Sequence, residues 1–484
     1  MGRWKGPFRR IDEFKIIIPP EYKAGMKVPG IIYVDEGLWE TTQEEQAPEQ
    51  VANVATLPGL LKYSLAMPDI HWGYGFPIGG VAAFETADGI ITPGGIGYDI
   101  NCGVRLLRTD LTLNQVKNKI ELLLETIFRN VPSGLGSKGK VKVSQNELDT
   151  VLIKGARFAV EKGYGCKEDL VFTEENGEMK GADTQAVSVE AKKRGFPQLG
   201  SLGSGNHFLE IQYVDTIYDE KTANAFGLKE GQITFLIHSG SRGLGHQVAT
   251  DYIKIIERTS HKYQVKLVDR QLAFVPLNSD EGKKYFSAMV GAANYAWANR
   301  QMITHWVRES FEEVFKSSWE KLGLKQVYDV AHNIAKIEKH TVDGVEKELI
   351  VHRKGATRAF PVGRPEIPDY YKNVGQPVLI PGDMGRYSYV LVGTQKGLEE
   401  TWGSTCHGAG RVMSRTAAKK ESSAQELLES LKKKGILVKA ESRGTLVEEA
   451  PEAYKDVSDV VNVVHGAGIS RKVCRMKPLG VTKG

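Results

Sequence analysis

The sequence predicts an α+β protein, in which mixed β-sheets are flanked by helices. Helical and β-rich runs occur throughout its 484 residues, but they do not alternate strictly, as they would in a doubly wound fold. Candidate site residues are spread from residue 99 to residue 407, and no linker, repeat or low-complexity tract divides them. Since one site would have to gather segments this distant, we expect residues 1–484 to form a single large domain.

Three helices are predicted from apolar periodicity. In the segment 113–128 apolar residues recur three and four apart after the N-cap candidate Thr112. A long helix is expected from about Glu281, after the cap candidate Asp280, through the run WVRESFEEVF. The run AQELLESLKKKG predicts a third helix, which Gly435 closes.

Short β-rich runs lie between these helices: GVAAF, GQITFLI, KELIVHR, QPVLIP and YSYVLVG. A glycine-rich run, GLGSKGKV at 134–141, fits G-x-G-x-x-G and nearly fits a phosphate-binding P-loop. It follows a helix instead of a strand, however, and Val141 stands where a P-loop has the Mg²⁺-binding Ser or Thr. We therefore expect a surface loop there. The chain also lacks the K-x-D-G motif of lysine-dependent nucleotidyltransferases.

Composition narrows the classes of protein. No apolar run is long enough to cross a bilayer, and the basic N-terminal segment lacks the apolar stretch of a signal peptide. The four cysteines have no regular spacing, which argues against a disulfide framework and favours the reducing cytoplasm. A net charge of +5 permits a nucleic-acid partner without demanding one.

The turn PGGIGYDINCGVR places Asp99 and Cys102 close together. A carboxylate and a thiol at this spacing make half of a metal site, although a buried cysteine beside a capping aspartate is also common packing. Four histidines each end or follow an apolar, strand-like run beside small residues: His207, His238, His332 and His407. Any one alone is compatible with a core residue, but together they indicate a site. In contrast, His261 and His340 lie in lysine-rich surroundings, and we expect them to be exposed.

One aspartate, one cysteine and three histidines are too many ligands for a four-coordinate zinc, and they suit two metals that share the thiolate. Two adjacent metals can clamp both oxygens of an in-line phosphoryl displacement, so a phosphate substrate is expected. Basic residues near the same motifs offer phosphate contacts, or are ordinary surface charges. They are Arg242, Arg353, Lys354, Arg358 and Arg411.

The motifs PDIHWGYGFPIGG, GGIGYDINCGVR, GSLGSGNHFLE, HSGSRGLGH, HRKGATR and CHGAGR together closely resemble the RtcB family of GTP-dependent RNA-splicing ligases, from about Met67 to the C-terminus. The resemblance implies an RtcB-like fold and a ligase that joins RNA ending in a 2′,3′-cyclic phosphate or 3′-phosphate to RNA with a 5′-hydroxyl. Such ligases act in tRNA splicing and RNA repair. Archease is an activating partner of many members.

By matching motifs, the resemblance implies two Mn²⁺ ions and GTP as cofactors. Asp99, Cys102 and His207 would hold one ion, and Cys102, His238 and His332 the other. His407 would attack the α-phosphate of GTP, which gives a histidine–GMP adduct. The GMP would then pass to the RNA 3′-phosphate and leave when the 5′-hydroxyl attacks.

The resemblance also assigns nucleotide and RNA contacts. Glu210 would accept hydrogen bonds from the N1/N2 edge of guanine and reject adenine. The guanosine nucleotide would contact Asn206, His207, Phe208, Leu209, Glu210, His332, Asn333, Pro381, Gly382, Asp383, Met384, Ser388, His407, Gly408, Ala409, Gly410, Tyr454 and Lys483. RNA would contact Asp69, His71, Arg242, Lys354, Arg358 and Arg411. Asp69 and His71 are equally compatible with support of other site residues. Without the resemblance, Tyr454 would be a surface aromatic and Lys483 part of a poorly ordered terminus.

Two other classes of protein remain open. A two-metal phosphatase or cyclic phosphodiesterase would need the metals and arginines but no nucleotide transfer. A structural RNA-binding protein would hold a metal incidentally. The segment CHGAGR separates them from a ligase, because hydrolysis needs no further histidine whereas guanylylation does.

Overall fold

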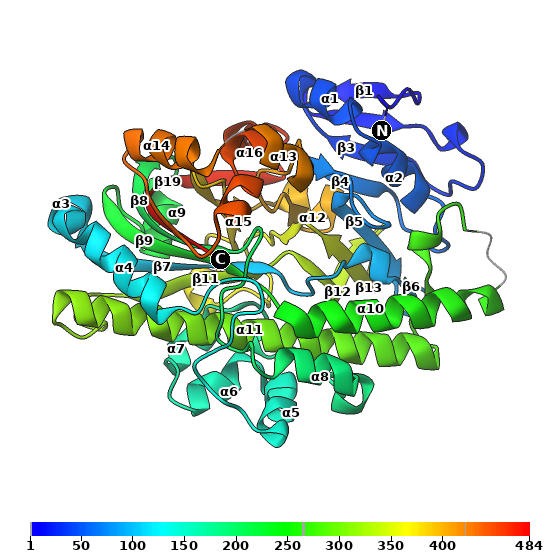
Figure 1. Ribbon diagram of the computed structural model, residues 1–484. Coiled ribbons are helices and arrows are strands. Elements are labelled where there is room, and N and C mark those ends of the chain that lie inside the picture. Colours follow the sequence, from blue (N-terminus) through cyan, green and yellow to red (C-terminus); the bar gives the residue numbers. More distant parts are fainter. Residues whose placement is uncertain (1, 264–266, 422) are drawn as a thin grey trace.

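The computed structural model describes residues 2–263, 267–421 and 423–484. It confirms the α+β prediction, with two mixed sheets at the centre and helices packed against them (Figure 1). The pairs β3/β4 and β18/β19 are parallel, and the other pairs between neighbouring strands of these two sheets are antiparallel. In spatial order, the first sheet contains β1 (Arg9–Asp12), β2 (Lys15–Ile18), β3 (Gly30–Tyr33), β4 (Ser64–His71), β5 (Ile78–Glu85), β13 (Val345–Lys354) and β12 (Asn333–Val342).

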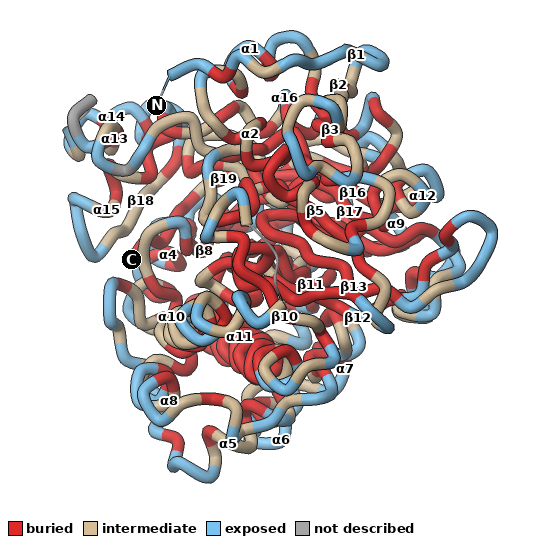
Figure 2. The backbone as a smooth tube through the Cα atoms, turned by 90° about the vertical axis from the view of Figure 1, so that its right-hand side faces the viewer, coloured by how far each residue is buried: buried red, intermediate tan, exposed pale blue. Residues whose placement is uncertain are grey.

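The strands of the second sheet carry or adjoin the candidate metal ligands. Its order is β11 (Lys325–Ala331), β7 (Gly103–Thr112), β9 (Gln232–Ser239), β8 (Phe208–Ile217), β19 (Ser470–Lys483), β16 (Ser388–Gly393) and β15 (Pro377–Ile380), with β18 (Leu437–Ala440) beside β19. Two short ladders pair β6 (Ile90–Ile91) with β10 (Val275–Pro276), and β14 (Thr357–Arg358) with β17 (Ser404–Thr405). The central strands form the buried interior seen in Figure 2.

Helices cover the sheets, and two long ones, α10 and α11, pack side by side below them (Figure 1). α5, α6 and α8 lie on the outer side of this pair. The helices are α1 (Glu36–Gln43), α2 (Ala47–Val54), α3 (Leu113–Val116), α4 (Ile120–Asn130), α5 (Gln145–Lys154), α6 (Ala156–Glu161), α7 (Lys167–Val171), α8 (Val189–Gly195), α9 (Glu220–Phe226), α10 (Arg242–Thr259), α11 (Asp280–Phe315), α12 (Gln395–Thr401), α13 (Arg415–Glu421), α14 (Ala424–Lys433), α15 (Arg443–Glu448) and α16 (Val457–Gly466). In the described part of the chain, none combines the length and apolarity that crossing a bilayer requires.

The predicted helices form, with small corrections at their ends. Thr112 caps α3 as expected, but a 3₁₀ turn at Lys117–Lys119 separates α3 from α4. The cap of α11 is Ser279 rather than Asp280, because the Ser279 hydroxyl accepts the Gly282 amide. The glycine-rich run at 134–141 is a loop after α4, as predicted.

A buried arginine of α11 connects this helix to the second sheet. Arg300 is fully buried and forms an ion pair with Asp329 of β11. It also donates to the carbonyls of Asn101 (2.8 Å) and Ser239 (2.9 Å). These two residues adjoin Cys102 and His238, so the long helix fixes the backbone on both sides of the candidate metal ligands.

Candidate active site

Asp99 and Cys102 lie in a tight turn between the 3₁₀ turn Pro93–Gly95 and β7. The Cys102 amide donates to the Asp99 carbonyl at 2.9 Å. Asn101 adopts a left-handed conformation (φ +52°) between them, stabilised by the contact of its carbonyl with Arg300. The turn thereby holds the carboxylate and the thiol side by side.

Strand register brings the histidines to this turn. β9 lies between β7 and β8, with His238 opposite Val104 on one side and Phe208 on the other. His207 therefore stands at the edge where β9 ends. It precedes a strand, which corrects our expectation that it would end one. The His207 Nε2 lies 2.8 Å from Asp99 Oδ2 and 3.6 Å from Cys102 Sγ.

Cys102 contacts both halves of the predicted metal centre. Its Sγ lies 3.2 Å from His238 Nε2, and Asp99, Cys102 and His207 offer ligand atoms within 4.8 Å of one another. His332 follows β11, and its ring lies 5.5 Å from that of His238. Its Nδ1 lies 3.1 Å from the Thr357 hydroxyl, whereas its buried Nε2 has no hydrogen-bond partner among the described residues.

The protonation states suit cation binding. Burial lowers the pKa of His238 and His332 well below the usual range, so both imidazoles are neutral and offer lone pairs. Burial would raise the pKa of Asp99, but His207 and Arg242 lower it to about 2. Burial and the Asp99 carboxylate raise the pKa of the Cys102 thiol well above its usual value. A divalent cation at the thiol would favour the thiolate, so this donor set fits two cations that share Cys102.

His407 follows β17, and its ring lies 5.2 Å from that of His332. Its Nδ1 is 2.5 Å from Asp69 Oδ2, and the same oxygen accepts the backbone amides of His407 (2.8 Å) and Gly408 (3.2 Å). Because Nδ1 is engaged in this way, Nε2 is the nitrogen left for a ligand. Asp69 is fully buried, and His407 holds its pKa below the ordinary value although burial alone would raise it.

The backbone around Asp69 is held by two further side chains. The Lys455 ammonium donates to the carbonyls of Pro68 (3.0 Å) and Ile70 (2.8 Å), on either side of Asp69. The Nδ1 of His71 lies 2.8 Å from the Asp69 carbonyl and donates to it. Burial lowers the pKa of His71 to about 3, so this imidazole is neutral. The contacts of Asp69 are therefore those of a residue that supports His407.

A cavity of about 220 Å³ joins these groups. It is lined by His71, Ile78, Cys102, Asn206, Phe208, His238, His332, Asn333, Gly355, Pro381, Gly382, Asp383, Met384, His407, Gly408, Ala409, Gly410, Arg411, Glu449, Tyr454 and Lys483. Residues from both sheets and from the loops after β15 and β17 thus meet around one space.

Comparison with known proteins gives the family. A family model described as "tRNA-splicing ligase RtcB" matches residues 50–484. The chain belongs to the RtcB family. The tRNA-splicing ligase RtcB of Methanococcus maripaludis is 59% identical over 99% of this chain and 100% of its own length. The RtcB proteins of Thermococcus kodakarensis and Archaeoglobus fulgidus are 58% and 56% identical, each over 99% of both chains.

In this RtcB chain, two neighbouring carboxyl groups form what we call the acidic end of the cavity: Asp383, which lines it, and Glu210, which lies close to Asp383 just outside the lining. Phe208 and Glu210 share a face of β8, whereas Leu209 points to the opposite face, into an apolar cluster. Glu210 is buried beneath the cavity lining, and burial raises its pKa to about 8. Burial likewise raises the pKa of Asp383 to about 6, and Asp383 contacts Arg386 at 2.9 Å.

Two residues that local sequence would place on the surface lie at the cavity instead. Lys483 is 4% exposed, because it extends β19 opposite Phe208. The Tyr454 hydroxyl accepts from Arg411 (2.9 Å) and donates to Glu449. The RtcB resemblance, and not the local composition, identified both positions.

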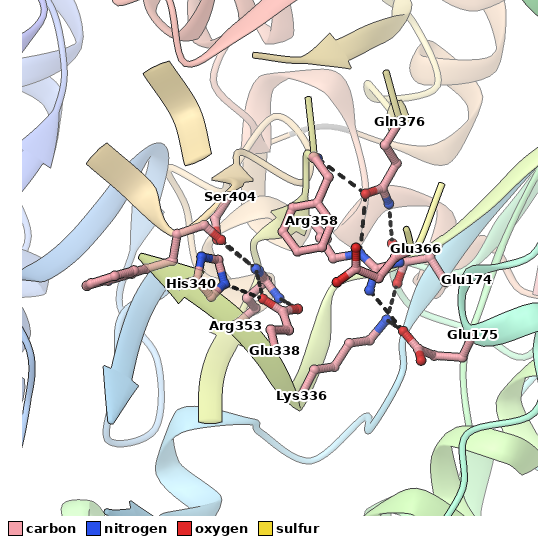
Figure 3. Close-up of polar contacts among 12 residues, drawn as sticks. Glu174, Glu175, Lys336, Glu338, His340, Arg353, Arg358, Glu366, Gln376 and Ser404 are labelled. Atoms are coloured by element: carbon pink, nitrogen blue, oxygen red, sulfur yellow. Dashed lines mark hydrogen bonds and ion pairs between the residues drawn. The ribbon is translucent and has the colours of Figure 1, made fainter. Parts of the chain in front are cut away.

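Other predicted basic contacts of the RtcB chain lie away from the cavity. Arg353 forms an ion pair with Glu338 and donates to Ser404 at 2.8 Å (Figure 3). Arg358 donates to Glu175 at 2.9 Å in a neighbouring group of ion pairs (Figure 3). Lys354 donates to the carbonyls of Tyr74 and Gly94, and burial lowers its pKa to about 7.

His340 corrects a prediction. It was expected to be exposed, but it is 3% exposed and contacts Glu338 at 3.0 Å (Figure 3). Arg242, at the start of α10, packs its guanidinium against Gly203, whose φ is +98°. Of the predicted basic RNA contacts, Arg411 is the one in the cavity lining of the described chain.

Sequence reasoning missed residues that position others. Thr357, which contacts His332, and Lys455, which brackets Asp69, lie next to predicted site residues in the chain. Gly355 has φ +61°, and a Cβ there would lie 3.1 Å from His407 Cε1. The glycine inside HRKGATR could have indicated this close approach.

Proposed function

We propose that this chain is an RNA ligase of tRNA splicing and RNA repair, which joins RNA 2′,3′-cyclic phosphate or 3′-phosphate ends to 5′-hydroxyl ends. A GMP carried on His407 would activate the RNA 3′-phosphate. One observation carries the proposal: a histidine held by a buried carboxylate faces a cavity that also contains the candidate ligands Cys102, His238 and His332. Family membership and the RNA-ligase names of the relatives support it.

The first step follows from the contacts of His407. The Nε2 lone pair forms a bond to the α-phosphorus of GTP while the bond to the pyrophosphate oxygen breaks. The proton on Nδ1 stays hydrogen-bonded to Asp69, whose negative charge stabilises the positive charge that develops on the ring. Water first opens a 2′,3′-cyclic end to a 3′-phosphate and a free 2′-hydroxyl. An oxygen of the RNA 3′-phosphate next attacks the phosphorus on His407, and the imidazole leaves. The RNA 5′-hydroxyl finally attacks the activated 3′ end, its proton passes to solvent, and GMP is released.

Two Mn²⁺ ions would supply Lewis-acid stabilisation of the phosphates. Asp99, Cys102 and His207 would hold one ion, and Cys102, His238 and His332 the other. Because a thiolate with imidazoles binds Zn²⁺ more tightly than Mn²⁺ in the usual affinity order, we expect Zn²⁺ to bind but to support turnover poorly.

The remaining assignments concern substrates and partners. Arg411 and Arg242 would contact RNA phosphates, and the acidic end of the cavity would take guanine. Lys354 and Arg358 are not carried forward, because Lys354 is buried and donates to two backbone carbonyls, and the charge of Arg358 is paired with Glu175. An archease-type protein is the expected activator. The free thiols of Cys102, Cys166, Cys406 and Cys474 suit work in the cytoplasm.

Labelling with α-³²P-GTP tests the proposal directly. Incubation with Mn²⁺ should give acid-labile label on the protein, and mass spectrometry should place GMP on His407. The protein should also join 3′-phosphate RNA to 5′-hydroxyl RNA. Phosphate release without any protein–GMP would support the two-metal phosphatase or phosphodiesterase instead. Label on a lysine would overturn the mechanism.

A further inference from the structure

Gln212 is a buried side chain beside the acidic end of the cavity. It lies two residues after Glu210 on β8, so both side chains are on the same face of the strand. Gln212 is fully buried, and its Nε2 donates to Glu210 Oε2 (2.6 Å) and to the Ser388 hydroxyl oxygen (3.0 Å). It does not line the cavity, so its effect on a ligand passes through Glu210.

These contacts leave the two oxygens of Glu210 in different states. Oε2 is bound by Gln212, whereas the buried Oε1 has no hydrogen-bond partner among the described residues. The Ser388 oxygen also accepts the Gly382 amide at 3.1 Å. Hydrogen bonds thus connect Glu210 through Gln212 and Ser388 to the loop that lines the cavity. One carboxyl oxygen is anchored, and the other is left without a protein partner in the described chain, two residues along β8 from the cavity-lining Phe208.

The same contact affects the charge of Glu210. Burial, with a smaller contribution from the Asp383 carboxylate, raises its pKa to about 8, although Gln212 and the Lys483 ammonium lower it. A donor at Oε2 therefore favours the carboxylate over the acid. This matters because the acid would present an O–H where a ligand N–H has to approach.

We propose that Gln212 is a positioning residue that sets nucleobase specificity, by holding Glu210 as an oriented carboxylate for the N1–H and 2-amino donors of guanine. This inference rests on the proposed guanylylation of His407. Guanine presents two adjacent donors, hypoxanthine presents the N1–H alone, and adenine presents an acceptor at N1. A carboxylate fixed in orientation distinguishes these bases better than one free to rotate or to become protonated.

The experiment compares GTP with inosine triphosphate in the formation of the His407 adduct. Wild type should prefer GTP. In Gln212→Met the apparent KM for GTP should rise about tenfold, the loss of roughly one charge-assisted hydrogen bond. The KM for inosine triphosphate should rise less, and the maximal labelling rate should stay near wild type. The preference for GTP therefore shrinks.

The dependence of the KM for GTP on pH gives a second readout. It would stay unchanged if Gln212 had only a structural role. In wild type the KM for GTP should fall as pH rises towards 8, because the carboxylate fraction of Glu210 grows. In Gln212→Met this change should occur at higher pH, since a contact that lowers the pKa is removed. Gln212→Ser provides a smaller side chain if Met disturbs the packing.

Thr234→Val is the matched control. Thr234 lies opposite Gln212 on β9, is fully buried, and its hydroxyl donates to Met476 Sδ at 3.7 Å. This variant should keep the GTP preference and the pH profile. An equal loss in Thr234→Val, or an unchanged preference and profile in both Gln212 variants, overturns the inference while the His407 adduct stands. Absence of the adduct in wild type would instead remove the proposed function, and the inference with it.

Discussion

Two of the buried polar clusters in the described part of the chain differ in how far their groups are paired. In the ion-pair network of Figure 3, both oxygens of Glu338 accept from Arg353, at 2.6 and 2.9 Å. In the candidate site, His332 Nε2 and Glu210 Oε1 have no hydrogen-bond partner in the described chain. A buried polar atom left unpaired costs free energy, and a ligand in the cavity would supply the partner that these two atoms lack.

The difference explains why similar residues have different uses. Arg353 and Arg411 both lie in predicted motifs and are both paired within the protein. Arg353 is buried with Glu338, however, whereas Arg411, which donates to the Tyr454 hydroxyl, lines the cavity. The network connects β12, β13 and β17, and these strands adjoin His332 and His407. We therefore interpret the paired cluster of Figure 3 as structural support, which we call the frame. We interpret the cluster with unpaired atoms as the ligand-binding site.

The largest expected effect is on activity in Cys102→Ala. The change removes the one side chain that both candidate cation sites share, so guanylylation and ligation should fall to background. The fold should persist, because the sulfur's polar contacts are with other site residues. Metal analysis measures the loss of the bound cations, and circular dichroism checks that the fold persists. Full activity in this variant would contradict the two-metal hypothesis.

His407→Ala should abolish one step and spare another. The variant should keep its metals, form no protein–GMP and fail to ligate 3′-phosphate RNA. It should still join RNA whose 3′ end is already guanylylated, because that step needs no histidine adduct. Gel analysis of both RNA substrates measures this, and a labelled His407→Ala protein would exclude His407 as the nucleophile.

Arg353→Met should lower stability rather than change specificity. It leaves Glu338 buried beside His340 without its guanidinium partner, at a cost of about 3–5 kcal/mol in the free energy of unfolding. Denaturant unfolding measures this. The control Arg129→Met breaks an exposed pair with Glu313 and should leave the unfolding curve near wild type. Equal curves for the two variants would remove the distinction between frame and site.

The sequence pattern predicted much of the fold, but it did not predict the burial of polar residues such as His340. Apolar periodicity located α4, α11 and α14, and the motifs identified the residues that gather around the cavity. In β12, however, Lys336, Glu338 and His340 point inward, while Ile337 is 42% exposed. The alternation of a strand was present, but its polar face is the buried one. Only the partners, which come from distant segments, make that arrangement stable.

The sequence singled out many of the residues that line the cavity, but not the contacts between them. The resemblance named Asp69, His407 and Glu210, yet it could not tell that Asp69 serves His407. It gave no indication of Gln212 or Thr357 either. Such contacts depend on strand register and on loops that meet across two sheets, which local spacing does not encode.

The smallest expected effect is a dependence of GTP binding on pH, which arises from the carboxyl group of Glu210. Burial raises the folded-state pKa of Glu210 to about 8, so the group is mostly protonated at pH 7 and half ionised near pH 8. Guanine needs the carboxylate, and GTP binding should therefore tighten about fivefold from pH 7 to pH 8. Asp383, with a pKa of about 6, is already ionised across this window and contributes little to the change.

Glu210→Gln should bind GTP weakly with a flat pH profile, as measured by titration of adduct formation at limiting GTP. A wild-type profile that is equally flat would mean that Glu210 is paired like Glu338, and that the acidic end of the cavity belongs to the frame rather than to the site.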